Sequence, residues 1–441
     1  MDTTSLERER PSAGGAERAL ADGAHKGRGA ALRDWLPSGP GRRLFLVAAL
    51  FFTASGLSST FVPIYLYELG GNSLTFLLLL LVPVFSVLAF TPLLLQRWRG
   101  PAFTQLLPVG ILALGAFQVS LSAFGYPILL GLSWGLGLAL FWPPFNTYLY
   151  DLTDGRKKIQ EITVIGVALP GFAGVVGPAV GGFLAAQHGL GLGLPAVFVL
   201  AAALYLGASL MSLGLPRHAA RSGTTVTSPF RVRGFRRFAV AYGLLGFTDT
   251  SWVVYPLFLF VLADRSLLDV GLIVSAVSIF SAVVAPLTAR WADRRRTTWV
   301  PALLGYLVFV GWLWGLGVTV QLWQVAVLGI AGVAGGLQVA LLRAYTTLFP
   351  TGSLPSAATG REMALGIGRL SNLVFTFLLL GSAPLTLALF HRYFFVLGTI
   401  ALAIPLWIFL TRLQAPAPED RTAGRGRLRG WPRHLALPGM R

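Results

Sequence analysis

Cysteine is absent from the 441 residues, and charged side chains make up only 12% of the chain. The first absence excludes disulfides, thiol catalysis and cysteine-ligated clusters. The five histidines have no acidic partners at metal-ligand spacing, and no GxxxxGKS/T, GxSxG or HExxH motif occurs. The sequence therefore predicts no enzyme, no metal site and no cofactor.

Twelve apolar runs fill most of the chain, and each is close to the roughly 20 residues that a membrane-spanning helix needs. Lipid offers no hydrogen-bond partners, and the runs are continuous rather than alternating, so they predict helices and not a barrel. The expected fold class is an all-α polytopic membrane protein in a lipid bilayer. The predicted spans are 44–66, 73–95, 102–123, 127–150, 161–186, 191–214, 238–262, 267–289, 299–318, 321–347, 363–387 and 393–412.

The basic residues predict how these helices are oriented. Of the 35 Lys and Arg residues, only Arg265 and Arg392 fall in loops on the side opposite to the N-terminus. Because positively charged loops face the cytoplasm, both termini are expected to be cytoplasmic. This placement accounts for the net charge of +18 without nucleic acid as a partner. Abundant Arg, Ala and Gly favour a bacterial source, and hence the inner or plasma membrane of a cell.

Two bundles of six helices are expected, residues 43–214 and 238–412, joined by a cytoplasmic linker at 215–237. Residues 1–42 lack apolar periodicity and predict a disordered cytoplasmic tail, and 413–441 predict a basic one that would touch anionic lipid at most.

An internal repeat supports this division. An offset of 193 residues aligns Pro63–Leu66 with Pro256–Leu259, and Arg97-Trp98 with Arg290-Trp291. Two anchors at one offset agree with a pseudo-symmetric arrangement of six plus six helices.

These features resemble the major facilitator superfamily over about residues 43–412. The family's loop signature is roughly GxLADRxGRR. Ala289–Arg296 (ARWADRRR) matches it after span eight, whereas the copy after span two lacks the acidic residue. The resemblance implies an ionic latch at the inner face, and the alternative is that these arginines only follow the positive-inside rule. The candidate latch residues are Arg97, Asp151, Arg290, Asp293 and Arg294.

Span five carries a glycine-proline motif that resembles the signature of drug–proton antiporters in this superfamily. Small residues let helices approach closely, and a proline removes one helix hydrogen bond, so such a helix could rock between the halves. The alternative is ordinary small-residue packing. Span four lacks the arginine that such antiporters often carry, since Leu132–Gly137 contains none. The residues of the motif are Gly174, Gly177, Pro178, Gly181 and Gly182.

Asp249 is the most conspicuous candidate for a functional group. It lies about twelve residues into span seven, or roughly 18 Å along the helix, near the bilayer centre. An acid at that depth costs about 2.5–3.5 kcal/mol on insertion scales, so it must face a water-filled cavity or a partner. Reversible protonation would suit a proton-coupling group. The alternative is a static acid satisfied by neighbouring hydroxyls such as Thr248 or Ser251.

Further polar and aromatic side chains fall in spans that would surround a central cavity. Arg369 could pair with Asp249, whereas Arg343 is expected to extend to the cytoplasm. Hydroxyls would line the cavity or bond to their own helices, and the aromatics would line it or face lipid. The candidate cavity residues are Ser55, Ser59, Asn146, Thr248, Asp249, Ser251, Trp252, Tyr255, Gln338, Arg369 and Asn372.

These patterns predict a secondary active transporter that works by alternating access, with its small-molecule site between the two halves. The first expectation is a monomer that exports small amphipathic compounds, hydrophobic cations among them, in exchange for protons. One alternative is an uptake carrier for a specific nutrient or metabolite. Another is a membrane receptor that kept the fold and lost transport.

Overall fold

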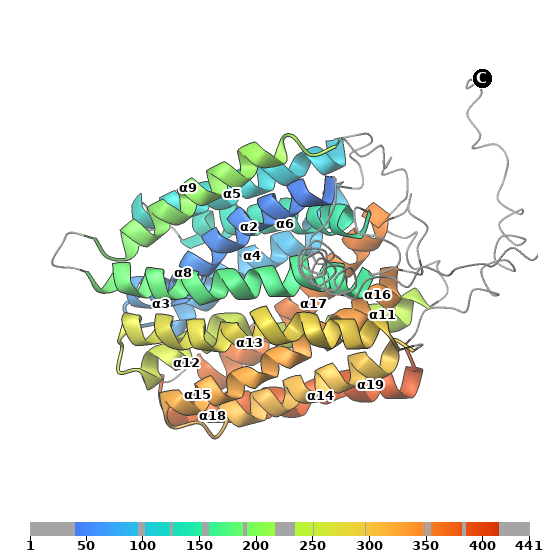
Figure 1. The fold of residues 1–441 in the computed structure, drawn as a ribbon. Coiled ribbons are helices and arrows are strands. Elements are labelled where there is room, and N and C mark those ends of the chain that lie inside the picture. The colour runs from blue at the N-terminus through green and yellow to red at the C-terminus, as the bar shows by residue number, and fades with distance from the viewer. Residues whose placement is uncertain are drawn as a thin grey trace, which may run out of the picture.

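The structure is a computed structural model in which every regular element of the described residues is a helix (Figure 1). Residues 1–39 and 414–441 of the predicted tails, most of the predicted linker and Arg97 lie outside the described residues, whereas residues 40–42 are the first residues of a helix. The described ranges are 40–95, 102–123, 127–151, 158–187, 192–216, 234–249, 251–295, 297–346, 348, 354–381 and 385–413.

The helices of the N-terminal half correspond to the first six predicted spans. Two of these spans are interrupted: the first breaks at Ser59-Thr60, and the fifth contains a π-helical turn. Their bounds are α2 Pro40–Ser58, α3 Phe61–Leu69, α4 Leu74–Leu95, α5 Ala102–Ala123, α6 Pro127–Asp151, α7 Lys158–Thr163, the π-turn η1 Val164–Ala168, α8 Leu169–Ala186 and α9 Leu194–Ser212.

The helices of the C-terminal half correspond to the last six spans. Span ten, predicted as continuous, is broken by a 3₁₀ turn rich in glycine, a residue that disfavours the helix interior. The bounds are α11 Phe235–Asp249, α12 Ser251–Leu262, α13 Leu267–Asp293, α14 Trp299–Leu316, α15 Leu322–Leu328, the 3₁₀ turn η3 Gly329–Gly332, α16 Val333–Thr346, α17 Leu354–Leu380, α18 Leu387–Ala401 and α19 Ala403–Thr411.

The side chains on the outer surface indicate whether water or lipid surrounds this fold. Within the described residues, eleven helical stretches are long and apolar enough to cross a membrane. Many large apolar side chains point outward, including Leu79, Phe90 and Leu378, which are 62%, 58% and 73% exposed. Water would penalise such a surface, whereas lipid would not. The predicted fold class, an all-α polytopic membrane protein of two six-helix bundles, is therefore confirmed.

The two halves meet along α8 and α13, which lie side by side at the centre of Figure 1. This approach is possible because glycines line both helices. A Cβ atom on Gly271 of α13 would stand 2.2 Å from the carbonyl oxygen of Pro178 in α8. Further contacts between the halves join α4 to α17, α3 to α12 near one end of the bundle, and α7 to α16 near the other. The contacts between halves therefore lie on both sides of the bundle's middle.

Candidate substrate cavity

A cavity of about 470 Å³ lies between the two halves and is lined by helices of both. The N-terminal half contributes side chains from α2, α3, α4, α5, α6 and α9, and the C-terminal half from α11, α12 and α17. A volume of this size is within the range of pockets that hold small organic molecules. The cavity therefore has the place and the size that a transported small molecule requires.

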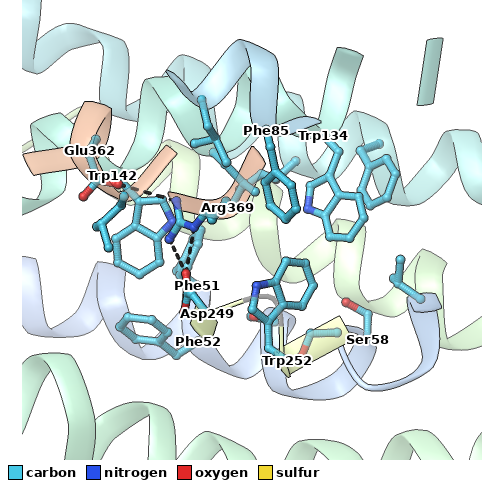
Figure 2. A pocket seen from close by; sticks show the side chains of 18 of the residues that line it. Phe51, Phe52, Ser58, Phe85, Trp134, Trp142, Asp249, Trp252, Glu362 and Arg369 are labelled. Atoms are coloured by element: carbon cyan, nitrogen blue, oxygen red, sulfur yellow. Dashed lines mark hydrogen bonds and ion pairs between the residues drawn. The ribbon is translucent and has the colours of Figure 1, made fainter. Parts of the chain in front are cut away.

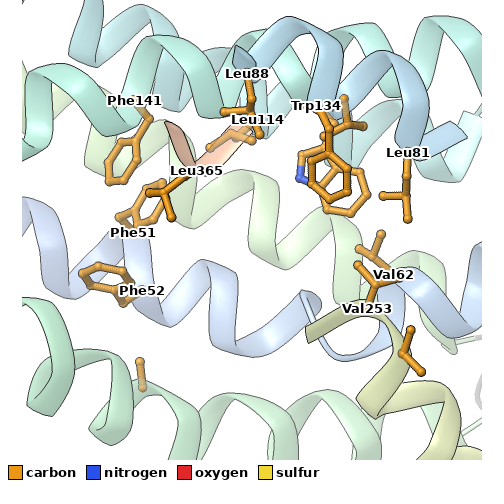
Figure 3. Close-up of a cluster of buried hydrophobic side chains, with 14 of the residues drawn as sticks. Phe51, Phe52, Val62, Leu81, Leu88, Leu114, Trp134, Phe141, Val253 and Leu365 are labelled. Atoms are coloured by element: carbon orange, nitrogen blue, oxygen red, sulfur yellow. The ribbon is translucent and has the colours of Figure 1, made fainter. Parts of the chain in front are cut away.

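Aromatic rings form most of the wall on the N-terminal side. Phe51 of α2 stacks on Phe141 of α6 with ring centroids 3.7 Å apart; both are labelled in Figure 3. Phe141 stacks in turn on Phe145 at 4.9 Å. Phe117 of α5 stacks on Trp134 of α6 at 4.9 Å. These rings hold one another in place, so the wall is a preformed apolar surface. The aromatic lining residues are Phe51, Phe52, Phe85, Phe117, Trp134, Trp142, Tyr205 and Trp252.

A cluster of four charged side chains lines the cavity, namely Asp249, Arg361, Glu362 and Arg369. Figure 2 shows Asp249, Glu362 and Arg369 together at one end. Arg369 of α17 donates two hydrogen bonds to Oδ2 of Asp249, from Nε at 2.7 Å and from Nη2 at 2.5 Å. Glu362 lies about two helical turns earlier on the same face of α17, with its Oε2 3.9 Å from Nη1 of Arg369. Arg361 contacts the same carboxylate at 2.8 Å. The two negative and two positive formal charges of the cluster therefore sum to zero.

The exposures of these side chains decide which of them a ligand would meet. The Asp249 side chain is 36% exposed, whereas Arg369 is 12%, Arg361 17% and Glu362 4% exposed. Both contacts from Arg369 use Oδ2, so they do not engage Oδ1. The group that the charged end presents most openly to the cavity is therefore the carboxylate of Asp249.

One hydrogen bond connects the charged cluster to the opposite half. Asn146 of α6 donates from its Nδ2 to Oε1 of Glu362 over 3.3 Å, and both residues are buried. Asn146 lies beyond two prolines in α6, where the helix backbone loses hydrogen-bond donors. The carboxylate of Glu362 thus contacts both arginines of its own half and Asn146 of the other half.

The structure places five of the predicted cavity residues in the lining, namely Ser55, Ser59, Asp249, Trp252 and Arg369. The other six lie outside it. Asn146 bonds to Glu362, the Thr248 hydroxyl donates to the Leu245 carbonyl, and the Asn372 amide oxygen accepts from Thr376. Ser251 is buried in α12, Tyr255 is half-buried there with its ring near Trp312, and Gln338 packs in α16 against Gly305.

Sequence reasoning missed Glu362, because the predicted span eleven began at residue 363. The helix α17 begins at Leu354 instead, since Glu362 and Arg361 neutralise each other and can enter the membrane region as a pair. A usable signal was present: Glu362, Leu365 and Arg369 follow the i, i+3, i+7 spacing of one helix face. Other missed lining residues are Phe51, Phe52, Phe85, Phe117, Gln118, Trp134, Trp142, Tyr205 and Arg361.

Four of the five candidate latch residues lie in the part of the chain that the structure describes, and Arg97 does not. Asp293 at the end of α13 accepts a hydrogen bond from Nη1 of Arg343 in α16 over 2.5 Å. Arg343, expected to extend to the cytoplasm, pairs with this acid, and its extension to the cytoplasm stays a prediction. Arg290 and Arg294 lie near Asp293 on the same chain segment, and Asp151 ends α6. The described pair joins two helices of one half, and a latch between halves stays a prediction.

Breaking this pair should weaken the end of the C-terminal bundle. The side chains of Arg343 and Asp293 are 26% and 14% exposed, so removing one of them takes a charged partner from a partly buried group. We expect Arg343→Met to lower the apparent melting temperature, measured by tryptophan fluorescence in detergent, by a few degrees. Arg392→Met, on an exposed position of α18, is the control and should melt like the wild type. Equal melting of all three proteins would contradict the prediction.

The glycines of span five pack on two helices at once. Cβ atoms on Gly177 and Gly181 would meet the α2 backbone at 2.5 Å, and Cβ atoms on Gly174 and Gly182 would meet α13. Pro178 is buried between them. The motif residues are thus the contact surface of α8 toward both its own half and the other half.

Comparisons with known proteins agree with this architecture. No family model matches the chain. It is 25% identical over 286 residues to the uncharacterized protein YqgE of Bacillus subtilis (strain 168), a match that covers 61% of this chain and 64% of YqgE. The matched region thus spans less than two thirds of that relative's length.

A solved structure shares the fold. It is the crystal structure of a POT family transporter in complex with 5-aminolevulinic acid, with a TM-score of 0.62 and 13% sequence identity over 85% of this chain and 96% of that one. The protein is therefore a multi-pass membrane protein with a transporter fold. At the level of fold, this supports the resemblance to the major facilitator superfamily, whereas the drug-efflux branch stays a prediction.

Proposed function

We propose that the protein is a secondary active transporter that moves small amphipathic compounds across a bacterial cell membrane by alternating access. The observation that carries this proposal is the cavity between the halves, with aromatic walls and one charged end. A compound with an apolar body and a polar or charged head would find both of its parts matched there. The basic loops favour a cytoplasmic position for both termini.

We further propose that the charged end couples transport to protons. The formal charges of the four side chains in the cluster sum to zero. An added positive charge would bind at the carboxylate of Asp249, which is the most exposed of the four groups. A proton and the ammonium group of a ligand would compete for that position. Because each displaces the other, the inward movement of protons would drive cationic compounds outward, and the protein would act as an exporter.

The two arginines favour a second candidate function. Arg361 and Arg369 both line the cavity, so a zwitterion could place its carboxylate near them and its ammonium at Asp249. The structurally similar POT family transporter was crystallised with 5-aminolevulinic acid, which is such a compound. In this case protons and substrate would move inward together, and acidifying the outside of proteoliposomes would accelerate entry of 5-aminolevulinic acid.

Neutralising Asp249 should abolish proton-driven transport. In inside-out membrane vesicles acidified by respiration, wild type should accumulate ethidium, a hydrophobic cation, and lose it when the gradient is collapsed. Asp249→Asn keeps the size of the side chain but removes the charge, so we expect at least a tenfold lower initial rate. Asp264→Asn, in an exposed loop, should transport like the wild type.

The possible results separate the candidates. Ethidium uptake that survives in Asp249→Asn would remove Asp249 from the coupling step. Absence of ethidium uptake by wild type, together with proton-driven entry of 5-aminolevulinic acid, would favour the uptake carrier. Absence of both would favour a receptor with a transporter fold.

A further inference from the structure

Gln118 carries a buried amide at the cavity that the proposed function leaves unused. Its side chain is 4% exposed and lines the cavity on the same face of α5 as Leu114 and Phe117, at the i, i+3, i+4 spacing. Its Oε1 has no hydrogen-bond partner within the described residues. Buried polar side chains in proteins are nearly always partnered, so an unpartnered amide beside a cavity indicates a group that completes it.

This amide is adjacent in sequence to Phe117, on the side of the cavity opposite to Glu362. Gln118 follows Phe117, which stacks on Trp134, and Trp134 meets Trp252 edge-on with centroids 5.5 Å apart. In Figure 2, Trp134 and Trp252 lie together at one side, and Trp142, Arg369 and Glu362 at the other. Trp134 and Trp142 are eight residues apart on α6, which is about 12 Å along a helix axis.

The chemistry of the amide sets what can bind to it. In the structure the Gln118 oxygen is covered, but a half-turn of the amide exchanges oxygen and nitrogen with little change in shape. Gln118 can therefore accept a hydrogen bond from a ligand or donate one to it. Between Gln118 and Asp249 the walls are aromatic, so the middle of the ligand must be apolar and is best flat.

We propose that Gln118 forms a distal hydrogen-bonding subsite, and that the preferred substrates are elongated aromatic amines with a hydroxyl or similar polar group at the end opposite to the amine. The ammonium group meets Asp249, the rings lie beside Trp134 and Trp252, and the distal hydroxyl bonds to Gln118. The proposal rests on the proposed function for the position of the ammonium group, and adds the length and the polarity of the substrate.

The test is binding of two rigid probes to the full chain in lipid nanodiscs, measured by titration calorimetry. One probe is para-(aminomethyl)biphenyl, and the other is the same amine with a para-hydroxyl group on its distal ring. Wild type should bind the hydroxylated amine about tenfold more tightly, because its hydroxyl forms a buried hydrogen bond with the Gln118 amide, which the plain amine cannot form. Gln118→Leu should bind both equally, and Gln105→Leu, exposed on the same helix, should keep the wild-type preference.

The outcomes distinguish the subsite from the proposed function. Binding of the plain amine by Gln118→Leu shows that the variant is folded and that the Asp249 end is intact. If wild type binds both amines equally, or if the preference survives in Gln118→Leu, the subsite is overturned and the proposed cation site stands. If wild type binds neither amine, the cation site itself fails, and the subsite falls with it.

Discussion

Replacing Arg369 by methionine should abolish transport and destabilise the protein. The substitution leaves Asp249 without the two hydrogen bonds that it accepts from Arg369, and Glu362 without one of its two neighbouring arginines. Removing one partner of a buried ion pair costs about 3–5 kcal/mol, and the partial exposure of Asp249 places the cost toward the lower end. We therefore expect ethidium uptake at background and a clear fall in the melting temperature measured by tryptophan fluorescence.

The double variant Asp249→Asn with Arg369→Met separates the two effects. It removes both charges of the pair, so its melting temperature should recover toward that of wild type. Transport should stay absent, because the proposed coupling carboxylate is gone. If the single variant Arg369→Met melted and transported like Arg392→Met, the pair would be irrelevant to both stability and function.

Adding one methyl group at Gly271 should block the movement between the halves. A Cβ atom there would stand 2.2 Å from the carbonyl oxygen of Pro178, and neither backbone can yield as a side chain would. Overpacking of this kind costs about 1–3 kcal/mol, and it pushes apart α8 and α13 at the main contact between halves. We expect Gly271→Ala to lower the rate of ethidium uptake at least tenfold.

Gly311→Ala is the matched control for this variant. Gly311 is also in a helix interior, but a Cβ atom there would have nothing within 4 Å. The substitution should therefore be neutral, or stabilise α14 by about 0.5–1 kcal/mol through the higher helix propensity of alanine. Normal uptake by Gly271→Ala would show that α8 and α13 can separate without loss of function.

The sequence predicted the fold class because lipid leaves few alternatives to apolar helices, and it singled out Asp249 and Arg369 because charges inside apolar runs are conspicuous. It did not predict Glu362, since a hydropathy window ends a span where charges appear, although the helix continues. It also could not tell which aromatic rings line the cavity. Trp134 and Trp142 differ from lipid-facing tryptophans only in helix rotation, which depends on packing between helices far apart in the chain.

The repeat makes the crossing of α2 with α8 comparable to that of α11 with α17. At the offset of 193 residues, Asp249 corresponds to Gly56, and Arg369 to Val176, the residue before Gly177. Gly56 and Gly177 are so close that a Cβ atom on the latter would stand 2.5 Å from the carbonyl carbon of the former. The crossing of α11 with α17 is equally close, because a Cβ atom on Gly368 would stand 2.0 Å from the carbonyl oxygen of Gly243. It also carries the pair of Asp249 and Arg369, for which the first crossing has no counterpart. A proton or a ligand at Asp249 would act on the second crossing, so a nearly symmetric architecture would sense its cargo through one half.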